Sequence, residues 1–473
     1  MNGSSLLNLE ETLRAVGGTC VLGKGDFCFT SVQTDSRAVQ EKSLFVPLIG
    51  EKQDGHAYVP QAVERGASVV FIARKNYEAD GSFFTALSAE HPEVFFITVD
   101  NTLAALQAAA ACYVQHFPSL IRIGVTGSSG KTSTKEIAAA ILSARYRVIT
   151  NKGNLNSETG LPLSVFTIRK EHQVGLFEMG MNRRDEMREL AAVLRPRYAL
   201  VTNIGTAHIG MLGSREGIAA EKAHVFDYLD GEGTAVIPAD DDFAAFLASR
   251  ANGKVVYYGN GKPAGVQLIA DRGLDGTEFS VEGQPVLLPL PGAYNYKNAL
   301  GAIALAQELG LSAGEIAAGI RSLKPLSGRS EVRRGTYTII QDCYNANPDS
   351  MDKAIALAAS VPGDFRRIYV LGDMLELGAD AAAAHAAAGK AAVHSGADAV
   401  VFVGSEMKSG YEAALAEHTK TVLHYIAGHD DAAIAAAAAA VQETARPGDL
   451  VLLKASRGMA LERLGAVLEG GAR

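Results

Sequence analysis

A glycine-rich segment at residues 126–133 has the residue types of a phosphate-binding loop. It reads TGSSGKTS and lies between an apolar segment at 120–125, predicted as a strand, and a segment with helical spacing. Glycines let backbone N–H groups and the helix N-terminus converge on phosphate oxygens, while a lysine reaches the outer phosphates and a threonine hydroxyl binds Mg²⁺. We therefore predict a nucleotide site formed by Thr126, Gly127, Ser128, Ser129, Gly130, Lys131, Thr132 and Ser133.

The loop departs from the general pattern GxxxxGK[ST], because Val125 stands where that pattern has its first glycine. The segment 151–154, NKGN, is similar to the guanine-reading NKxD sequence of regulatory GTPases, but Asn154 replaces the aspartate. A glycine turn followed by an exposed lysine is the structural alternative. The strand and helix on either side favour phosphate binding.

The elements around this loop predict an α/β protein with three domains. Residues 1–100 predict a small α/β domain, residues 101–323 a central domain with a parallel sheet, and residues 324–473 a Rossmann-like α/β domain. Residues 266–290 interrupt the central alternation and predict a short meander of strands. The segment KPLSG at 324–328 predicts a linker between the last two domains.

Apolar runs predict the other strands. Alanine-rich runs predict two helices, at 379–392 and 432–440, for which we expect no role in catalysis or binding. The predicted strands of the central and C-terminal domains fall at residues 174–177, 198–202, 234–238, 337–341, 367–371, 399–403 and 450–453.

The composition narrows the classes of molecule that the protein is expected to bind. The 473 residues carry a net charge of −8, so no general basic surface is available for nucleic acid or anionic lipid. The four cysteines are scattered without CxxC spacing, which is typical of buried thiols in a reducing compartment. No signal-type N-terminus and no apolar stretch of about 18 residues is found, so we expect a cytoplasmic protein without membrane insertion.

Motifs along most of the chain resemble those of the Mur ligase family. The loop has its first glycine at 127, as in the shortened loop of these ligases and of the related folylpolyglutamate synthases. Further matches follow in the family's order, in LFEMG, TNIGTAH, EGIAAEK, GAYNYKNALGA, SGRSE and DCYNANPDSM. The N-terminal segments TDSR, FVPLIG and DGH resemble the family's UDP-sugar-binding domain, which folylpolyglutamate synthases lack. The resemblance implies an ATP-dependent ligase that activates a carboxylate as an acyl phosphate, which an amine then attacks.

The C-terminal motifs DCYNANPDSM, LGDMLELG and KASRGM resemble the branch of the family that adds D-alanyl-D-alanine to a UDP-muramoyl tripeptide in peptidoglycan precursor synthesis. This implies that residues 1–100 bind the UDP substrate and that residues 324–473 close over ATP and bind the dipeptide, in a chain expected to act as a monomer. A diamino-acid-adding ligase and a folylpolyglutamate synthase remain alternatives, although no DNP-type sequence of the former is found. A non-catalytic nucleotide switch is a remote alternative, because it would be expected to lack His208, Lys222 and Asn295.

The resemblance also implies two Mg²⁺ ions. Thr132 and Glu178 would hold one between the β- and γ-phosphates, and His208 would bind the second. Lys222, carbamylated by CO₂, would present two oxygens to Mg²⁺ as a carboxylate does. Together with Lys131, His208 and Lys222 form the predicted catalytic set. The alternatives are a solvated acid at a strand end, a structural histidine and an ordinary helix-surface lysine.

Four residues are predicted to complete the ATP site. Asn295 and Asn298 lie three residues apart on one helical face, and amide groups suit an adenine edge. By resemblance, Arg329 and Asp342 contact phosphate and ribose from the third domain. A helix N-cap is the alternative for Asn295.

The remaining candidates are polar residues predicted to bind the two other substrates. For the UDP substrate they are Ser36, Arg37, Asn151, Asn154 and Asn156. For the dipeptide they are Tyr344, Asn345 and Asn347. A plain polar loop is the alternative for residues 151–156, and Pro348 is equally a helix-start signal.

Overall fold

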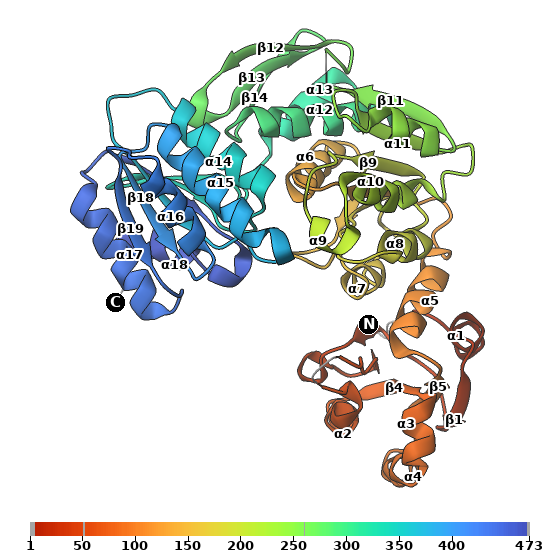
Figure 1. Ribbon diagram of the computed structural model, residues 1–473. Coiled ribbons are helices and arrows are strands. Elements are labelled where there is room, and N and C mark those ends of the chain that lie inside the picture. Colours follow the sequence, from red (N-terminus) through yellow and green to blue (C-terminus); the bar gives the residue numbers. More distant parts are fainter. Residues whose placement is uncertain (1–4, 51–52, 260, 471–473) are drawn as a thin grey trace.

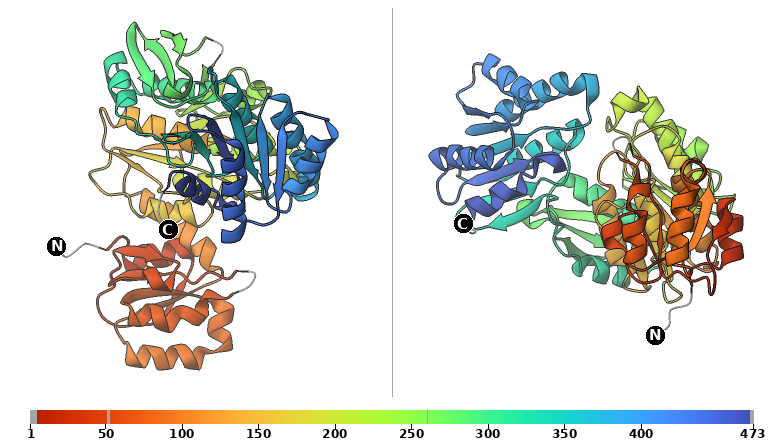
Figure 2. Two further views of the ribbon diagram at one scale, coloured as in Figure 1. Left: turned by 90° about the vertical axis from the view of Figure 1, so that its left-hand side faces the viewer. Right: turned by 90° about the horizontal axis from the view of Figure 1, so that it is seen from below.

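The computed structural model describes residues 5–50, 53–259 and 261–470, which fold into three α/β units along the chain (Figure 1). This arrangement confirms the predicted fold class. The N-terminal unit is joined to the central unit through helix α5 (Thr102–Val114), and the C-terminal unit packs on another side of the central unit (Figure 2).

The N-terminal unit has a five-stranded sheet in the order β1-β5-β4-β3-β2. Its first strand pairs antiparallel with β5, and the other neighbours are parallel. The strands are β1 (Thr19–Leu22), β2 (Ser31–Gln33), β3 (Ser43–Phe45), β4 (Ala67–Ala73) and β5 (Phe95–Val99). The helices are α1 (Leu9–Val16), α2 (Val59–Glu64), α3 (Arg74–Ala79) and α4 (Gly81–Glu90).

The central unit is built on a fully parallel sheet in the order β11-β10-β9-β6-β8-β7. Its strands are β6 (Ile121–Thr126), β7 (Val148–Thr150), β8 (Val174–Glu178), β9 (Tyr198–Val201), β10 (Thr234–Pro238) and β11 (Lys254–Tyr258). The predicted meander is confirmed as an antiparallel sheet of β12 (Val266–Asp271), β13 (Thr277–Val281) and β14 (Gln284–Leu288). Besides α5, the helices are α6 (Lys131–Leu142), α7 (Gly160–Val165), α8 (Glu186–Leu194), α9 (Ile209–Leu212), α10 (Arg215–Ala223), α11 (Ala244–Arg250), α12 (Ala293–Glu308) and α13 (Ala313–Arg321).

The C-terminal unit has a sheet in the order β15-β16-β20-β17-β18-β19, in which only β15 is antiparallel. Its strands are β15 (Glu331–Arg334), β16 (Thr338–Asp342), β17 (Arg367–Gly372), β18 (Ala399–Val403), β19 (Val422–Ile426) and β20 (Leu450–Lys454). Its helices are α14 (Pro348–Ser360), α15 (Ala381–His394), α16 (Met407–Ala416), α17 (Asp431–Thr444) and α18 (Glu462–Leu468). Both alanine-rich segments are therefore helical, as predicted.

In the central and C-terminal units, the strands β11, β15 and β19 were not predicted from the sequence. All three lie at an edge of their sheet, and most of their side chains are only partly buried. An edge strand with polar positions lacks the continuous apolar run that marks a central parallel strand.

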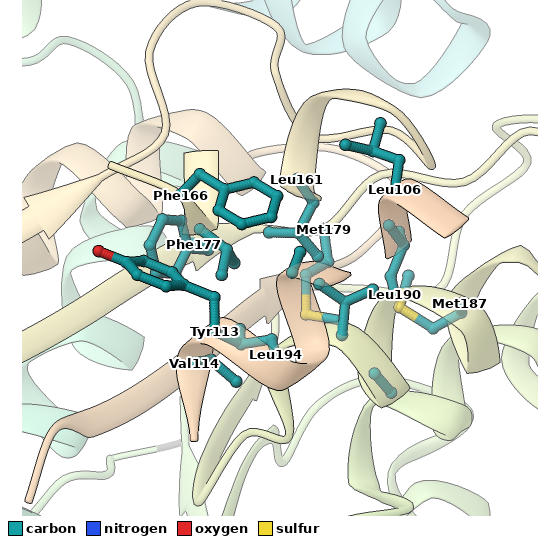
Figure 3. Close-up of a cluster of buried hydrophobic side chains, with 14 of the residues drawn as sticks. Leu106, Tyr113, Val114, Leu161, Phe166, Phe177, Met179, Met187, Leu190 and Leu194 are labelled. Atoms are coloured by element: carbon teal, nitrogen blue, oxygen red, sulfur yellow. The ribbon is translucent and has the colours of Figure 1, made fainter. Parts of the chain in front are cut away.

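Helix α5 packs on both of the units that it joins. It contacts α1 and β4 on the N-terminal side, and α7 and α8 on the central side. The central contact is a dry cluster in which Tyr113 and Leu106 of α5 lie against Phe166, Met179 and their neighbours (Figure 3). The Tyr113 hydroxyl donates to the Ile168 carbonyl oxygen at 2.7 Å, so its one polar atom is satisfied. This packing anchors α5 to the central unit, whose sheet carries the loops of the site.

No helix within the described ranges is long and apolar enough to cross a membrane.

Candidate active site

The phosphate-binding loop connects β6 to α6, and two of its glycines are required by geometry. Gly127 has φ 146°, and a Cβ atom there would lie 1.8 Å from Thr202 Oγ1. Gly130 has φ 77°, and its Cβ would lie 2.6 Å from Asn298 Oδ1. Val125 is a fully buried residue of β6, so the turn begins after it and needs no glycine at that position. The chain therefore makes the shorter loop that its sequence indicated.

The segment after β9 holds this loop in place. The Ser128 N–H donates to the Asn203 carbonyl oxygen at 3.0 Å, and the Ser129 N–H donates to Asn203 Oδ1 at 2.9 Å. The Lys131 ammonium folds back onto the Gly127 carbonyl oxygen at 2.9 Å. The first N–H groups of α6 have no partner within the helix, as at any helix start. The loop is thus preformed, with a helix N-terminus behind it.

Glu178, the last residue of β8, lies directly beside the loop. Its Oε2 accepts from Thr132 Oγ1 at 2.5 Å and its Oε1 accepts from Asn156 Nδ2 at 2.7 Å. The side-chain amide of Asn151 bonds to the backbone N–H and carbonyl oxygen of Glu178, at 3.0 and 2.9 Å. Asn151 is buried and does not line the cavity described below, so it positions Glu178, which differs from the substrate contact expected for it.

Three basic side chains gather close to this carboxylate. Burial lowers the pKa of Lys131 and the pKa of Lys222, and the charge of Lys131 lowers the latter further. Burial and the charges of Lys131 and Lys222 lower the pKa of His208 to about 3, so its ring is neutral at physiological pH. Lys222 is almost completely buried, and the nearby charges of Glu221 and Glu186 oppose the lowering of its pKa.

The neighbouring acid Glu221 points elsewhere. Its Oε1 accepts from the Met187 N–H at 2.9 Å and its Oε2 from the Asp185 N–H at 3.0 Å, so it caps the start of α8. Only Lys222 of this pair is therefore free to act near the loop.

The C-terminal unit supplies the opposite wall. Arg329 Nη2 donates to Thr132 Oγ1 at 2.7 Å, and its guanidinium carbon lies 3.9 Å from the centroid of the Tyr344 ring. Asp342 at the end of β16 pairs with Lys454 at 3.0 Å. Lys353 of α14, which the sequence analysis did not select, donates to Ser129 Oγ at 3.3 Å. The site is thus shared between two units.

Asn295 and Asn298 both lie on α12 next to the loop. Helix α12 begins at Ala293 with Gly292 as its N-cap, so the cap alternative for Asn295 is wrong. Asn295 Nδ2 instead donates to the Pro291 carbonyl oxygen at 2.8 Å, and Asn298 packs against Gly130.

The candidates for the UDP substrate are split between two places. Asn154 and Asn156 line the cavity beside the loop. Ser36 and Arg37 belong to the N-terminal unit and do not line it: Ser36 Oγ donates to Gln61 Oε1 at 2.6 Å, and Arg37 is exposed and paired with Asp35.

Tyr344, Asn345 and Asn347 line the same cavity from the C-terminal unit. The Asn347 side chain accepts from the Ser350 N–H at 2.9 Å and caps α14, so Pro348 does begin a helix.

The cavity between the central and C-terminal units has a volume of about 530 Å³. A second cavity of about 550 Å³ adjoins it, since Ser129, Tyr294, Asn298 and Lys353 line both. The carboxyl ends of β6, β8 and β9 face those of β16, β17 and β20 across this space, which is where α/β sheets bind ligands. Lys454, Arg457 and Glu376 also line it and were missed, although the motifs LGDMLELG and KASRGM contain them.

A preformed phosphate loop, a carboxylate at its threonine and cations from a second unit define an enzyme that handles phosphorylated substrates between two domains. Three family descriptions match the chain: "Mur ligase family, catalytic domain" over residues 29–113, "Mur ligase middle domain" over 125–306, and "Mur ligase, glutamate ligase domain" over 328–457. The chain belongs to the Mur ligase family, which confirms the resemblance drawn from its motifs.

Individual relatives are similar to this chain over nearly its whole length. The chain is 43% identical to the UDP-N-acetylmuramoyl-tripeptide--D-alanyl-D-alanine ligase of Treponema pallidum, covering 98% of this chain and 99% of the relative. It is similar to a crystal structure of MurF from Acinetobacter baumannii, with 28% identity, a TM-score of 0.84 and 98% of each chain covered. MurF ligase from Thermotoga maritima in complex with ADP is 26% identical, with a TM-score of 0.75, covering 93% of this chain and 97% of that one.

We expect Gly127→Ala to abolish binding of a non-hydrolysable ATP analogue, because the added methyl group collides with Thr202 and the residue needs a positive φ. Gly314→Ala is the matched control, since nothing lies within 4 Å of a Cβ there. Isothermal titration calorimetry with Mg²⁺ present measures both. Affinity of Gly127→Ala within threefold of the parent protein would contradict the assignment of the loop.

Proposed function

We propose that this chain is the ATP-dependent ligase that joins D-alanyl-D-alanine to UDP-N-acetylmuramoyl-tripeptide in peptidoglycan precursor synthesis. The observation that carries the proposal is the single cavity in which the phosphate loop and Glu178 face Arg329, Lys454 and the other cations of the C-terminal unit. The name of the 43% identical relative from Treponema pallidum supplies the identity of the substrates.

Two protein oxygens beside the loop suit a magnesium ion. Thr132 Oγ1 and Glu178 Oε2 are already 2.5 Å apart, and Mg²⁺ bound to a nucleotide takes most of its other ligands from phosphates and water. We therefore propose that these two residues would hold a magnesium ion, which would supply positive charge to the phosphates of the nucleotide. His208, neutral by virtue of its low pKa, is assigned to a second ion.

Lys222 suits carbamylation. CO₂ reacts only with an uncharged amine, and burial next to Lys131 lowers the pKa of the Lys222 amine. A carbamate there would replace this buried amine by an anion close to Lys131. It would supply two oxygens that could hold a second Mg²⁺.

The chain's own residues position a two-step reaction. Lys131, Arg329 and the N-terminus of α6 hold the triphosphate, while the second cavity beside Asn298 accommodates the adenosine end. A carboxylate oxygen of the tripeptide attacks the γ-phosphorus and ADP leaves. The dipeptide amine then attacks the acyl carbon, the C–O bond to phosphate breaks, and a proton and phosphate are released.

Two further assignments follow. Asn154 and Asn156 hold the peptide end of the UDP substrate, with Ser36 and Arg37 at its uridine end in the N-terminal unit. The central and C-terminal units of the chain supply both walls of the cavity, and we propose that the chain acts as a monomer.

We predict that phosphate release from ATP and Mg²⁺ requires both UDP-muramoyl tripeptide and D-alanyl-D-alanine. The purified protein is assayed with either the dipeptide or meso-diaminopimelate, the latter offered with the UDP-muramoyl dipeptide that a diamino-acid-adding ligase extends. Mass spectrometry of the product identifies the bond formed. Release that depends only on the diamino acid would reject this function in favour of the other branch of the family.

Lys222→Ala should lower kcat at least a hundredfold, because it removes the carbamate, and a small carboxylate such as formate should restore part of the rate. The exposed Lys420→Ala is the control and should keep full activity. Unchanged turnover of Lys222→Ala would remove the carbamate from the account. A loss that no carboxylate relieves, with ¹³C-bicarbonate giving no carbamate signal in the parent protein's NMR spectrum, would do so as well.

A further inference from the structure

Three carboxylates line the cavity between the central and C-terminal units, and two of them are already engaged. Glu178 accepts hydrogen bonds from Thr132 and Asn156, and Asp342 pairs with Lys454. Glu376 is the third. Its Oε2 lies 3.8 Å from His208 Nδ1, which is too long for a hydrogen bond.

Glu376 lies in the loop that follows β17, and its backbone has φ 66°. A positive φ is uncommon for a residue with a side chain. His208 across the cavity also has a positive φ, 65°. The side chain of Glu376 is 72% exposed, so its carboxylate faces the open part of the cavity.

A cation lies on the adjoining loop. Arg457 follows β20, which is the neighbour of β17 in the sheet, and lines the same cavity. One of its guanidinium nitrogens is 3.2 Å from Glu462 Oε1, and its guanidinium carbon lies 5.8 Å from the centroid of the Tyr344 ring. Its other nitrogens remain available. The remaining cations of the cavity are bound to the phosphate loop or, in the case of Lys454, to Asp342.

The loops of Glu376 and Arg457 are bonded to each other. The Leu375 N–H donates to Ser456 Oγ at 2.9 Å, and the Ser456 N–H donates to the Asp373 carbonyl oxygen at 3.1 Å. The side chain of Leu375 also reaches Gly458, where an added Cβ would lie 2.8 Å from Leu375 Cδ1. The two charged residues are therefore held on one rigid double loop of the C-terminal unit.

A dipeptide with free ends carries an ammonium at one end and a carboxylate at the other, roughly 7 Å apart when extended. We propose that Glu376 binds the ammonium end of the incoming dipeptide and that Arg457 binds its terminal carboxylate, which places the amine on the side of His208 and the phosphate loop. The assignment rests on the proposed function. It also gives a chemical role to LGDMLELG and KASRGM.

The test varies the dipeptide at saturating ATP and UDP-muramoyl tripeptide. Glu376→Gln and Arg457→Gln should each raise the KM for D-alanyl-D-alanine at least tenfold and leave the KM values of ATP and the UDP substrate within twofold. Glu406→Gln and Arg446→Gln are matched controls, because both side chains are exposed and lie outside the cavity. Unchanged dipeptide KM in either site variant overturns the assignment of that residue, and so does a raised Mg²⁺ requirement in Glu376→Gln.

A second arm replaces the dipeptide by D-alanyl-D-alaninamide, which lacks the terminal carboxylate. The parent enzyme should show at least a tenfold higher KM for the amide. Arg457→Gln should use the amide and the acid with equal KM, whereas Glu376→Gln should still discriminate between them. Equal KM for the amide and the acid in the parent enzyme excludes a cationic carboxylate site.

The two arms separate this inference from the proposed function. A parent enzyme that releases no phosphate in response to D-alanyl-D-alanine contradicts the function itself. Dipeptide-dependent turnover that neither variant alters contradicts only the roles of Glu376 and Arg457. Arg457→Lys, which keeps the charge, should lie between the parent and Arg457→Gln.

Discussion

A cluster of buried basic side chains at the carboxyl end of the central sheet is the constraint on which the site depends. Lys131 and Lys222 lie close enough to His208 to lower its pKa, and Lys131 lowers the pKa of Lys222. The carboxylates of Glu178 and Glu376 lie near Lys131 and His208, respectively. Gathering basic groups in a buried place is costly unless anions compensate them. We infer that the phosphates of a bound nucleotide supply that negative charge.

The same constraint explains why a second unit is needed. Arg329 and Lys353 reach the phosphate loop from the C-terminal unit, so the complete set of phosphate contacts exists only when the two units are together. The linker at 324–328 lies between them and has no helix or strand. Residues of both units contact the loop, so a ligand bound there lies between them.

Much of this was predictable from the chain. The apolar runs of the central strands and the glycine positions of the loop have direct physical causes, namely burial on both sheet faces and a backbone that tolerates no Cβ at Gly127. Edge strands such as β19 escaped prediction because they are only half buried. The part that Asn151 plays in holding Glu178 was not predictable, since a buried amide that holds a strand end is identical in sequence to one that binds a ligand.

Lys353 and Glu376 were not predicted, for a different reason. Their significance comes from residues far away in the chain, Ser129 for the lysine and His208 for the glutamate, and no local spacing encodes those contacts. Motifs such as LGDMLELG identified a branch of the family, but they did not indicate which residue lies opposite Glu376. Only the packing of two sheets against one cavity brings these side chains together.

The central claim is that a magnesium-bound triphosphate neutralises the charge cluster beside Glu178. A crystal structure with a non-hydrolysable ATP analogue and Mg²⁺ tests it most directly. The account predicts phosphates along residues 127–132, with the metal on Thr132 and Glu178 and with Arg329 at the phosphates. A nucleotide bound elsewhere, or a metal without contact to Glu178, would contradict it.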